Sequence, residues 1–276
     1  MKKLIKPFAI ICSLALTITS CKKQTKDFSE DGISETTISQ IKSLGFGTQG
    51  VKKVQGGFLV EGDILLSEAD LSSSPGSTPQ MVIAQEEQYR TFNLVSVTKH
   101  PTIKVALNNS SAQHDPAFSA ALDEAIRRYN AEGLQLSFTR VTTSQAPDIT
   151  IVAFYENSST LGSAGFPNSS GDPYNQVRMN TYHYSTSTGT TNVNYISTII
   201  SHEMGHCIGF RHTDYMARQY SCGGRRKVNE GTAGVGAILI PGTPSQPDAE
   251  SWMLACSNGG NRLFNANDVI ALNYLY

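Results

Sequence analysis

From about residue 100 to the C-terminus, the sequence predicts an α+β fold. Short segments in which apolar and polar residues alternate, as they do in half-buried strands, recur along this part of the chain. Longer segments with apolar residues at helical spacing lie among them, and Gly, Pro and Ser separate the two kinds. The chain of 276 residues is 39% hydrophobic, which is enough for a packed core.

Strands are expected where the alternation is clearest, at 103–107, 134–141, 148–154 and 176–183. Asp115-Pro116 begins a helix that continues to Asn130, because Pro is favoured in the first turn and Gly133 follows the last apolar position. A second helix is expected to begin at Asn194. A last helix is expected over residues 266–274, with a polar residue at its start.

Residues 33–99 form a separate, smaller segment that resembles a pro-region. Residues 34–44 have helical spacing, 57–66 is expected to be a strand, and a Ser-, Pro- and Gly-rich linker covers 72–80. Residues 21–32 are polar and predict a tether. This division leaves 100–276 as the main domain.

The first 20 residues predict a signal peptide, because lysines precede an apolar run at 8–18 that is too short to span a bilayer comfortably. The Ile-Thr-Ser-Cys sequence that ends at Cys21 resembles the lipobox of bacterial lipoproteins, in which the cysteine is acylated. The resemblance implies attachment to a bacterial cell envelope, at the outer membrane or the cell surface, through a lipid anchor only. A plain secretory signal with an incidental cysteine is the alternative.

The charge balance of the chain argues against nucleic acid as a partner. The formal net charge is −1, so no basic excess is available to hold nucleic acid. We expect a monomer that meets the membrane only through its anchor.

The segment from His202 to His212 has the pattern HExxHxxGxxH. On a helix, His202 and His206 lie one turn apart on the same face, and Glu203 lies beside them. Gly209 can adopt the left-handed conformation that ends a helix, which lets His212 return as a third nitrogen ligand. Three protein ligands leave one position open for water, which is typical of catalytic zinc and not of structural zinc. The spacing is the metzincin signature.

The order of strands and helices, together with this motif, resembles a metzincin zinc protease. The resemblance implies a twisted mixed sheet with helices above the cleft, and an irregular lower part that contains a Met-turn and ends in a helix. Ser251-Trp252-Met253-Leu254 matches the Met-turn, with Met253 beneath the zinc. The His-Glu-Met-Gly-His core looks most like the dual-action HEIGH metallopeptidases. Many astacin-type relatives have a tyrosine two residues after the methionine, where this chain has Ala255; Tyr215 could replace it or could simply pack against the helix.

These residues predict a zinc-dependent endopeptidase that is secreted or anchored at the envelope and acts on polypeptides. His202, His206 and His212 would hold Zn²⁺, and Glu203 would act as general base toward the attacking water. Asp214 could orient a ligand ring or be a loop charge. The alternatives are a zinc hydrolase of another amide or ester, and a catalytically silent binding protein on the same scaffold.

Two further expectations concern latency and cysteine pairing. The segment around Asp63 resembles the astacin pro-peptide stretch in which an aspartate binds zinc, so Asp63 is a possible zymogen switch; a Gly-Asp turn between strands is the alternative. Among Cys207, Cys222 and Cys256, a Cys222–Cys256 disulfide is preferred, because both lie in the irregular region after the motif. The residues leave substrate preference, calcium binding and removal of 22–99 open.

Overall fold

The structure is a computed structural model that describes residues 32–72, 88–108, 112–225, 227–231, 236–244 and 247–276. The expected signal peptide, Cys21 and nearly all of the 21–32 tether lie outside these residues, as does most of the 72–80 linker. Within the described residues, no helix is both long enough and apolar enough to cross a bilayer.

The main sheet has five strands in the order β6-β5-β7-β9-β8, and it confirms the predicted α+β class. Strands β6, β5, β7 and β9 run parallel to one another, while β8 runs antiparallel to β9 at one edge. The strands are β5 (Thr102–Asn108), β6 (Ser137–Val141), β7 (Ile149–Phe154), β8 (Gly162–Ser163) and β9 (Gln176–Asn180). Short 3₁₀ turns follow β6 at Thr143–Gln145 and β9 at Thr181–His183. The residues expected as the last part of a 176–183 strand therefore form a turn.

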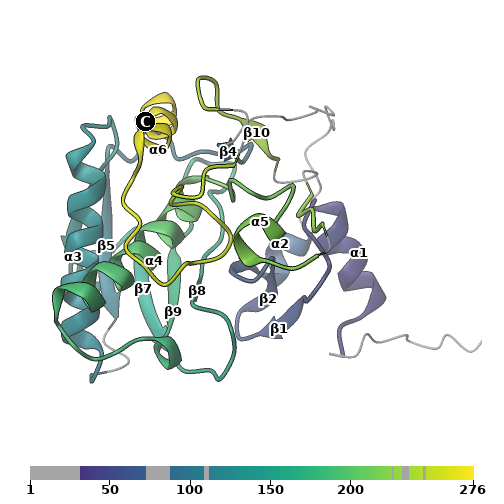
Figure 1. Cartoon of the computed structure of the whole chain (residues 1–276), viewed down its shortest axis with the longest axis horizontal. Helices are drawn as coiled ribbons and strands as arrows, with labels where there is room; N and C mark the ends of the chain where they lie inside the picture. The colour runs from purple at the N-terminus through teal and green to yellow at the C-terminus, as the bar shows by residue number, and fades with distance from the viewer. Residues whose placement is uncertain (1–31, 73–87, 109–111, 226, 232–235, 245–246) are drawn as a thin grey trace, which may run out of the picture.

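Two long helices pack against this sheet and against each other, α3 (Asp115–Ala131) and α4 (Thr190–Ile208) (Figure 1). Alternate residues of β5 and β7 point into the same core as Phe118 and Leu122 of α3 and Ile196 of α4. The core therefore fixes α4 in a defined position above the sheet.

Helix α4 begins four residues before the expected start at Asn194. Gly189 is its N-cap, in an extended conformation, and no side chain caps the first turn. Neither Thr190 nor Thr191 is a strong helix former, and the first buried residue of α4 is Ile196. Packing of the later turns therefore stabilises a first turn that the helix propensities of its residues do not predict.

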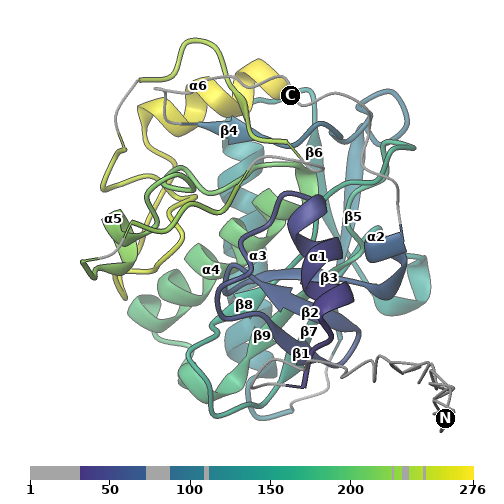
Figure 2. The same ribbon diagram turned by 90° about the vertical axis from the view of Figure 1, so that its right-hand side faces the viewer.

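The N-terminal unit is a small three-stranded antiparallel sheet with two helices beside it (Figure 2). Its elements are α1 (Glu35–Ser43), β1 (Lys52–Val54), β2 (Gly57–Val60), β3 (Ile64–Leu66) and α2 (Glu68–Ser72). The single strand expected over 57–66 is thus a hairpin, β2 and β3, whose turn is formed by Glu61, Gly62 and Asp63. A separate hydrophobic cluster, which includes Ile41, Phe46 and Val60, holds this unit together.

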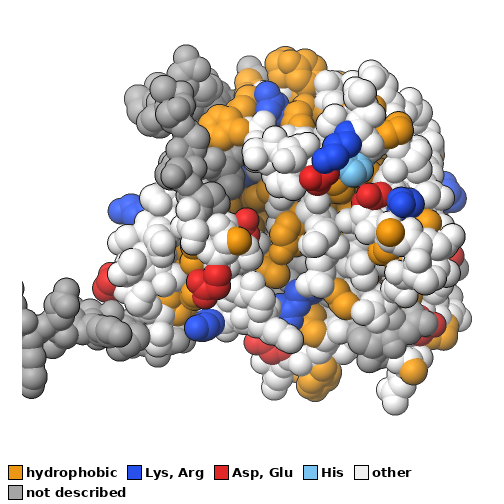
Figure 3. Space-filling view, turned by 180° about the vertical axis from the view of Figure 1, so that it is seen from behind, with side chains coloured by type: hydrophobic (Ala, Val, Ile, Leu, Met, Phe, Trp, Pro, Cys, Tyr) orange, Lys and Arg blue, Asp and Glu red, His pale blue; other side chains and the backbone are white. Residues whose placement is uncertain are grey.

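The remaining part after α4 is largely irregular. It contains α5 (Gln219–Cys222), β10 (Ile238–Leu239) and the closing helix α6 (Ala266–Leu275). β10 pairs with β4 (Tyr89–Arg90), so the residues just before 100 contact the main domain. A disulfide joins Cys222 to Cys256, as preferred from the sequence, and Cys207 is buried and free. Figure 3 shows one face of the molecule, on which positive and negative side chains are interspersed.

Asp268 in α6 is a buried acid that anchors the segment 251–253. It accepts hydrogen bonds from the Trp252 backbone N–H (3.2 Å), the Ser251 hydroxyl (3.0 Å) and the Gln88 amide (2.6 Å). Burial raises the pKa of Asp268 to about 7, although these hydrogen bonds act in the opposite direction.

The raised pKa predicts a pH-dependent stability. The folded protein keeps the proton of Asp268 up to about pH 7, whereas an unfolded Asp loses it near pH 4. The stabilisation of the folded state by this proton is therefore complete below about pH 4. It is lost as the pH rises through 7, and the free energy of unfolding falls by up to about 4 kcal/mol. Denaturant unfolding at saturating zinc should show this fall in the parent and not in Asp268→Asn. Equal pH dependence in the two proteins would contradict the prediction.

Candidate metal centre

Three histidines converge at the C-terminal end of α4. His202 and His206 are one turn apart and are both buried. Gly209 ends the helix with a φ of 110°, a left-handed conformation that favours glycine, and its amide returns to the carbonyls of Gly205 and His206. The chain then reverses, so that His212 faces the other two rings as the motif predicts.

The ring nitrogens are spaced as a zinc ion requires. Nε2 of His206 lies 3.1 Å from Nε2 of His202 and 3.2 Å from Nε2 of His212. Two nitrogens that each lie about 2.0–2.1 Å from a tetrahedral zinc are roughly 3.3 Å apart. The three rings therefore fit one Zn²⁺ with little adjustment.

Each ring is oriented by a hydrogen bond from its other nitrogen. Nδ1 of His202 is 2.9 Å from the Trp252 carbonyl, and Nδ1 of His206 is 2.8 Å from the Phe210 carbonyl. Nδ1 of His212 lies 2.9 Å and 3.0 Å from the two carboxylate oxygens of Glu230. Because each Nδ1 donates to an oxygen, Nε2 is the nitrogen of each ring that is left to bind the metal once it carries no proton.

Glu230 is a functional residue that the sequence did not reveal. It is 1% exposed and also accepts a hydrogen bond of 2.7 Å from Nη1 of Arg218. Asp214, a candidate for this role by its position in the sequence, instead accepts hydrogen bonds from Ser221 and from the Ala255 backbone N–H. Burial alone would lower the pKa of His212, but the carboxylates of Asp63 and Glu230 raise it well above its usual range. Zinc uptake must therefore displace a proton from this ring.

Substituting Glu230 by Gln should weaken zinc binding by about 10- to 100-fold, because the amide supports the imidazole less strongly than the carboxylate does. Competition with a chromophoric chelator measures the affinity. Glu132→Gln, at the end of α3, provides the control for loss of one carboxylate. Zinc affinity equal to that of the parent would show that Glu230 does not support the ligand.

Glu203 lies beside the histidines on the same helix. It is 2% exposed, and its Oε2 has no hydrogen-bond partner among the described residues. A Cβ on Gly162 of β8 would lie 2.8 Å from Oε1 of Glu203, so the carboxylate lies directly against this edge strand. Burial and the nearby Asp63 raise the pKa of Glu203 well above its usual range. A buried carboxylate with a raised pKa is a stronger base than an ordinary glutamate.

Met253 is fully buried and packs against α4 at the metal centre. A Cβ on Gly205 would lie 2.7 Å from Sδ of Met253 and 2.4 Å from the Trp252 ring, so both side chains pack on the helix between His202 and His206. The Met253 carbonyl accepts a hydrogen bond of 2.9 Å from the amide of Thr213, next to His212. The turn at 251–254 thus supports both parts of the motif.

The family to which the sequence belongs agrees with this geometry. The family model of the dual-action HEIGH metallo-peptidases matches residues 59–276. The chain belongs to this family. The peptidase is therefore a zinc-dependent metallopeptidase, and zinc is its metal. It is similar to a solved structure titled "Structure of myroilysin", with 15% sequence identity and a TM-score of 0.38 over 62% of this chain and 90% of that chain. No curated protein matches it.

In this peptidase, the N-terminal unit contributes a fourth group to the metal centre. Oδ2 of Asp63 lies 3.1 Å from Nε2 of His212 and 3.7 Å from Nε2 of His202. The four side chains are close enough together to hold one ion. Burial would raise the pKa of Asp63, but His212 and His202 lower it well below its usual range. The carboxylate is therefore ionised, as a metal ligand must be.

The backbone around Asp63 is paired with the edge of the main sheet. The Leu65 amide donates to the Ala164 carbonyl (2.8 Å), and the Ala164 amide donates to the Asp63 carbonyl (2.9 Å), in a parallel bridge. Glu61 adds a buried contact of 3.1 Å with Arg211, the residue before His212. The hairpin turn is thus fixed across the zinc position.

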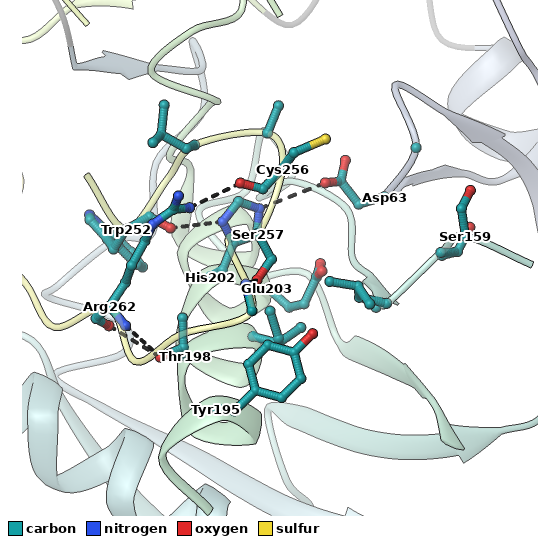
Figure 4. A pocket seen from close by; sticks show the side chains of 18 of the residues that line it. Asp63, Ser159, Tyr195, Thr198, His202, Glu203, Trp252, Cys256, Ser257 and Arg262 are labelled. Atoms are coloured by element: carbon teal, nitrogen blue, oxygen red, sulfur yellow. Dashed lines mark hydrogen bonds and ion pairs between the residues drawn. The ribbon is translucent and has the colours of Figure 1, made fainter. Parts of the chain in front are cut away.

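A cavity of about 440 Å³ opens beside His202 (Figure 4). His202 and Glu203 line it, and Asp63 lies at its side. Tyr215 does not line it; this side chain is 1% exposed and packs edge-on against Tyr89 at 4.4 Å between ring centroids. The interpretation of Tyr215 as a packed residue is therefore the one the structure supports.

Proposed function

We propose that the peptidase is an endopeptidase whose metal ligands are His202, His206 and His212. The convergence of the three Nε2 atoms, with Glu203 on the same helix, is the observation that carries this proposal. Bound zinc supplies Lewis acidity that polarises the scissile carbonyl and acidifies a water molecule.

Glu203 acts as general base and then as general acid. Its buried carboxylate is close to the metal position, and its raised pKa suits removal of a proton from the attacking water. The same carboxyl group then protonates the leaving amine. The hydrogen bonds that the three Nδ1 atoms donate keep the ligand rings in place throughout, and Met253 packs against the helix that carries two of them.

The full-length chain is latent in this proposal. Asp63 occupies the position next to His202 and His212 that a water molecule and a substrate carbonyl would need. The backbone bridge to Ala164 covers the edge strand, where an extended substrate would otherwise add as a further strand. Release of the hairpin from this edge therefore precedes catalysis, and loss of the Asp63 carboxylate favours that release because it removes the contact of the turn with the metal position.

The location proposed for the peptidase follows from the N-terminal sequence alone. Cys21 follows the Ile-Thr-Ser lipobox-like sequence, and lipidation there would anchor the protein to a bacterial envelope. Loss of membrane association in Cys21→Ser cells, measured by fractionation, is the outcome that this proposal requires. The alternative is secretion after ordinary signal cleavage.

The proposed activity is tested with zinc-loaded Asp63→Ala protein and a panel of denatured proteins. We expect internal cleavages, identified by mass spectrometry of the new termini, that disappear after chelation and return with zinc. Cleavage confined to chain ends would indicate an exopeptidase. Zinc-bound, folded protein that cleaves no peptide would instead favour hydrolysis of another amide or ester, or a silent binding protein.

A further inference from the structure

The wall of the cavity beside Glu203 includes a charged side chain, that of Arg262, which has no part in the proposed catalytic mechanism. Its wall is formed by α4, by the residues that lead into β8, and by the segment after Met253. Apolar side chains provide much of the lining: Leu161, Tyr195, Ile199, Trp252 and Leu254. Arg262 also lines the cavity, and Figure 4 shows it on the side opposite Asp63.

The side chain of Arg262 is largely buried, and it forms no ion pair with a carboxylate of the described residues. The residue is 8% exposed, and its Nη1 donates to the Cys256 carbonyl at 3.0 Å. Its Nε is buried with no hydrogen-bond partner in the part of the chain that the structure describes. Burial lowers the pKa of Arg262, while Glu250, Asp214 and Asp268 raise it from a distance.

An arginine in this environment lowers the stability of the ligand-free enzyme. A buried charge without a directly hydrogen-bonded counter-charge is destabilising, and a carboxylate can accept two hydrogen bonds from one guanidinium. Arg218 also lines the cavity, but its Nη1 is already paired with the carboxylate of Glu230, so Arg262 is the lining arginine that is left for a ligand. A side chain with a short hydrocarbon stem and a terminal carboxylate would place its stem against the apolar part of the lining and its charge against Arg262.

We propose that this cavity binds an acidic side chain, Asp or Glu, of the substrate residue next to the scissile bond, and that Arg262 contacts its carboxylate. The inference rests on the proposed endopeptidase function. His202 and Glu203 line the same cavity, so a side chain within it belongs to a residue that flanks the bond being cut. Arg262 is thereby a specificity-determining residue.

The test profiles cleavage of a peptide library by zinc-loaded Asp63→Ala protein, with mass spectrometry of the products. We expect Asp and Glu to be enriched at one position flanking the cut. For matched peptides, kcat/KM for Glu should exceed that for Gln by about tenfold or more. Arg262→Gln in the same background should reduce this ratio to near one, and Arg262→Lys should retain part of it.

Controls separate this inference from a general defect. Arg127→Gln removes an exposed guanidinium on α3 and should leave the Glu-to-Gln ratio unchanged. Arg262→Gln should still cleave peptides with neutral residues at that position, which shows that it is folded. An unaltered acidic preference in Arg262→Gln, or no acidic preference in its parent, would overturn the inference.

A binding measurement covers the case in which the protein cleaves nothing and the proposed function fails. Calorimetry with zinc-loaded Asp63→Ala protein would compare short peptide amides that begin with Glu and with Gln. We expect the Glu peptide to bind about tenfold more tightly, and this difference to disappear in Arg262→Gln. Equal affinities for the two peptides would overturn the proposed acid-binding cavity independently of catalysis.

Discussion

Glu203→Gln should leave zinc bound but reduce peptide cleavage by about 10²- to 10⁴-fold, because the amide cannot accept a proton from the attacking water. The three histidines and their Nδ1 partners do not include Glu203, so the metal centre should remain intact. The comparison is made in the Asp63→Ala background, with kcat/KM from a fluorogenic peptide and zinc content from elemental analysis.

The matched control is Glu132→Gln, which changes a carboxylate to an amide at the end of α3. It should have the zinc content and activity of its parent. If Glu203→Gln keeps most of the activity, the assignment of Glu203 as general base is wrong. If it loses zinc as well as activity, the loss would reflect the metal centre and not proton transfer.

Asp63→Ala in the full-length chain should increase peptide cleavage by about tenfold or more, because it removes the carboxylate that competes with water and substrate for the zinc position. The parent should become equally active once the hairpin has been released by proteolysis. Initial rates with one peptide, measured before and after processing, provide the comparison.

Glu68→Ala is a suitable control, since this acid is exposed in α2 of the same N-terminal unit. It should leave the full-length chain latent. If Asp63→Ala is no more active than the unprocessed parent, while processed parent is active, then steric cover by the hairpin and not the carboxylate accounts for latency. If both Asp63→Ala and processed parent are inactive, the peptidase function itself is in doubt.

The parts of the site that the sequence predicts are those with fixed local spacing. His202 and His206 are one helical turn apart, and His212 follows Gly209 by a fixed number of residues. The spacing of the motif therefore determines how the three ligands are arranged. Met253 could be assigned because the turn that contains it matches the family over consecutive residues. Helix α4 and the strands β5 and β7 follow from periodicity in the same way.

The rest depends on contacts that no periodicity encodes. Glu230 lies in an irregular segment, 18 residues after the histidine that it supports, and Arg262 reaches the cavity from the loop before α6. Asp214 is nearer to His212 in sequence, yet its carboxylate is held by Ser221 and Ala255. Proximity along the chain made Asp214 a candidate for the contact with His212, with a loop charge as the alternative. Tertiary packing decides which carboxylate meets a ligand ring, and it is Glu230.

Anomalous diffraction at the zinc edge, from crystals of the zinc-loaded full-length chain, tests most directly whether Asp63 closes a three-histidine zinc site. We expect one strong peak about 2.0–2.2 Å from Nε2 of His202, His206 and His212 and from a carboxylate oxygen of Asp63. A zinc peak that lacks any of these histidines, or that binds them while Asp63 lies elsewhere, would contradict this arrangement.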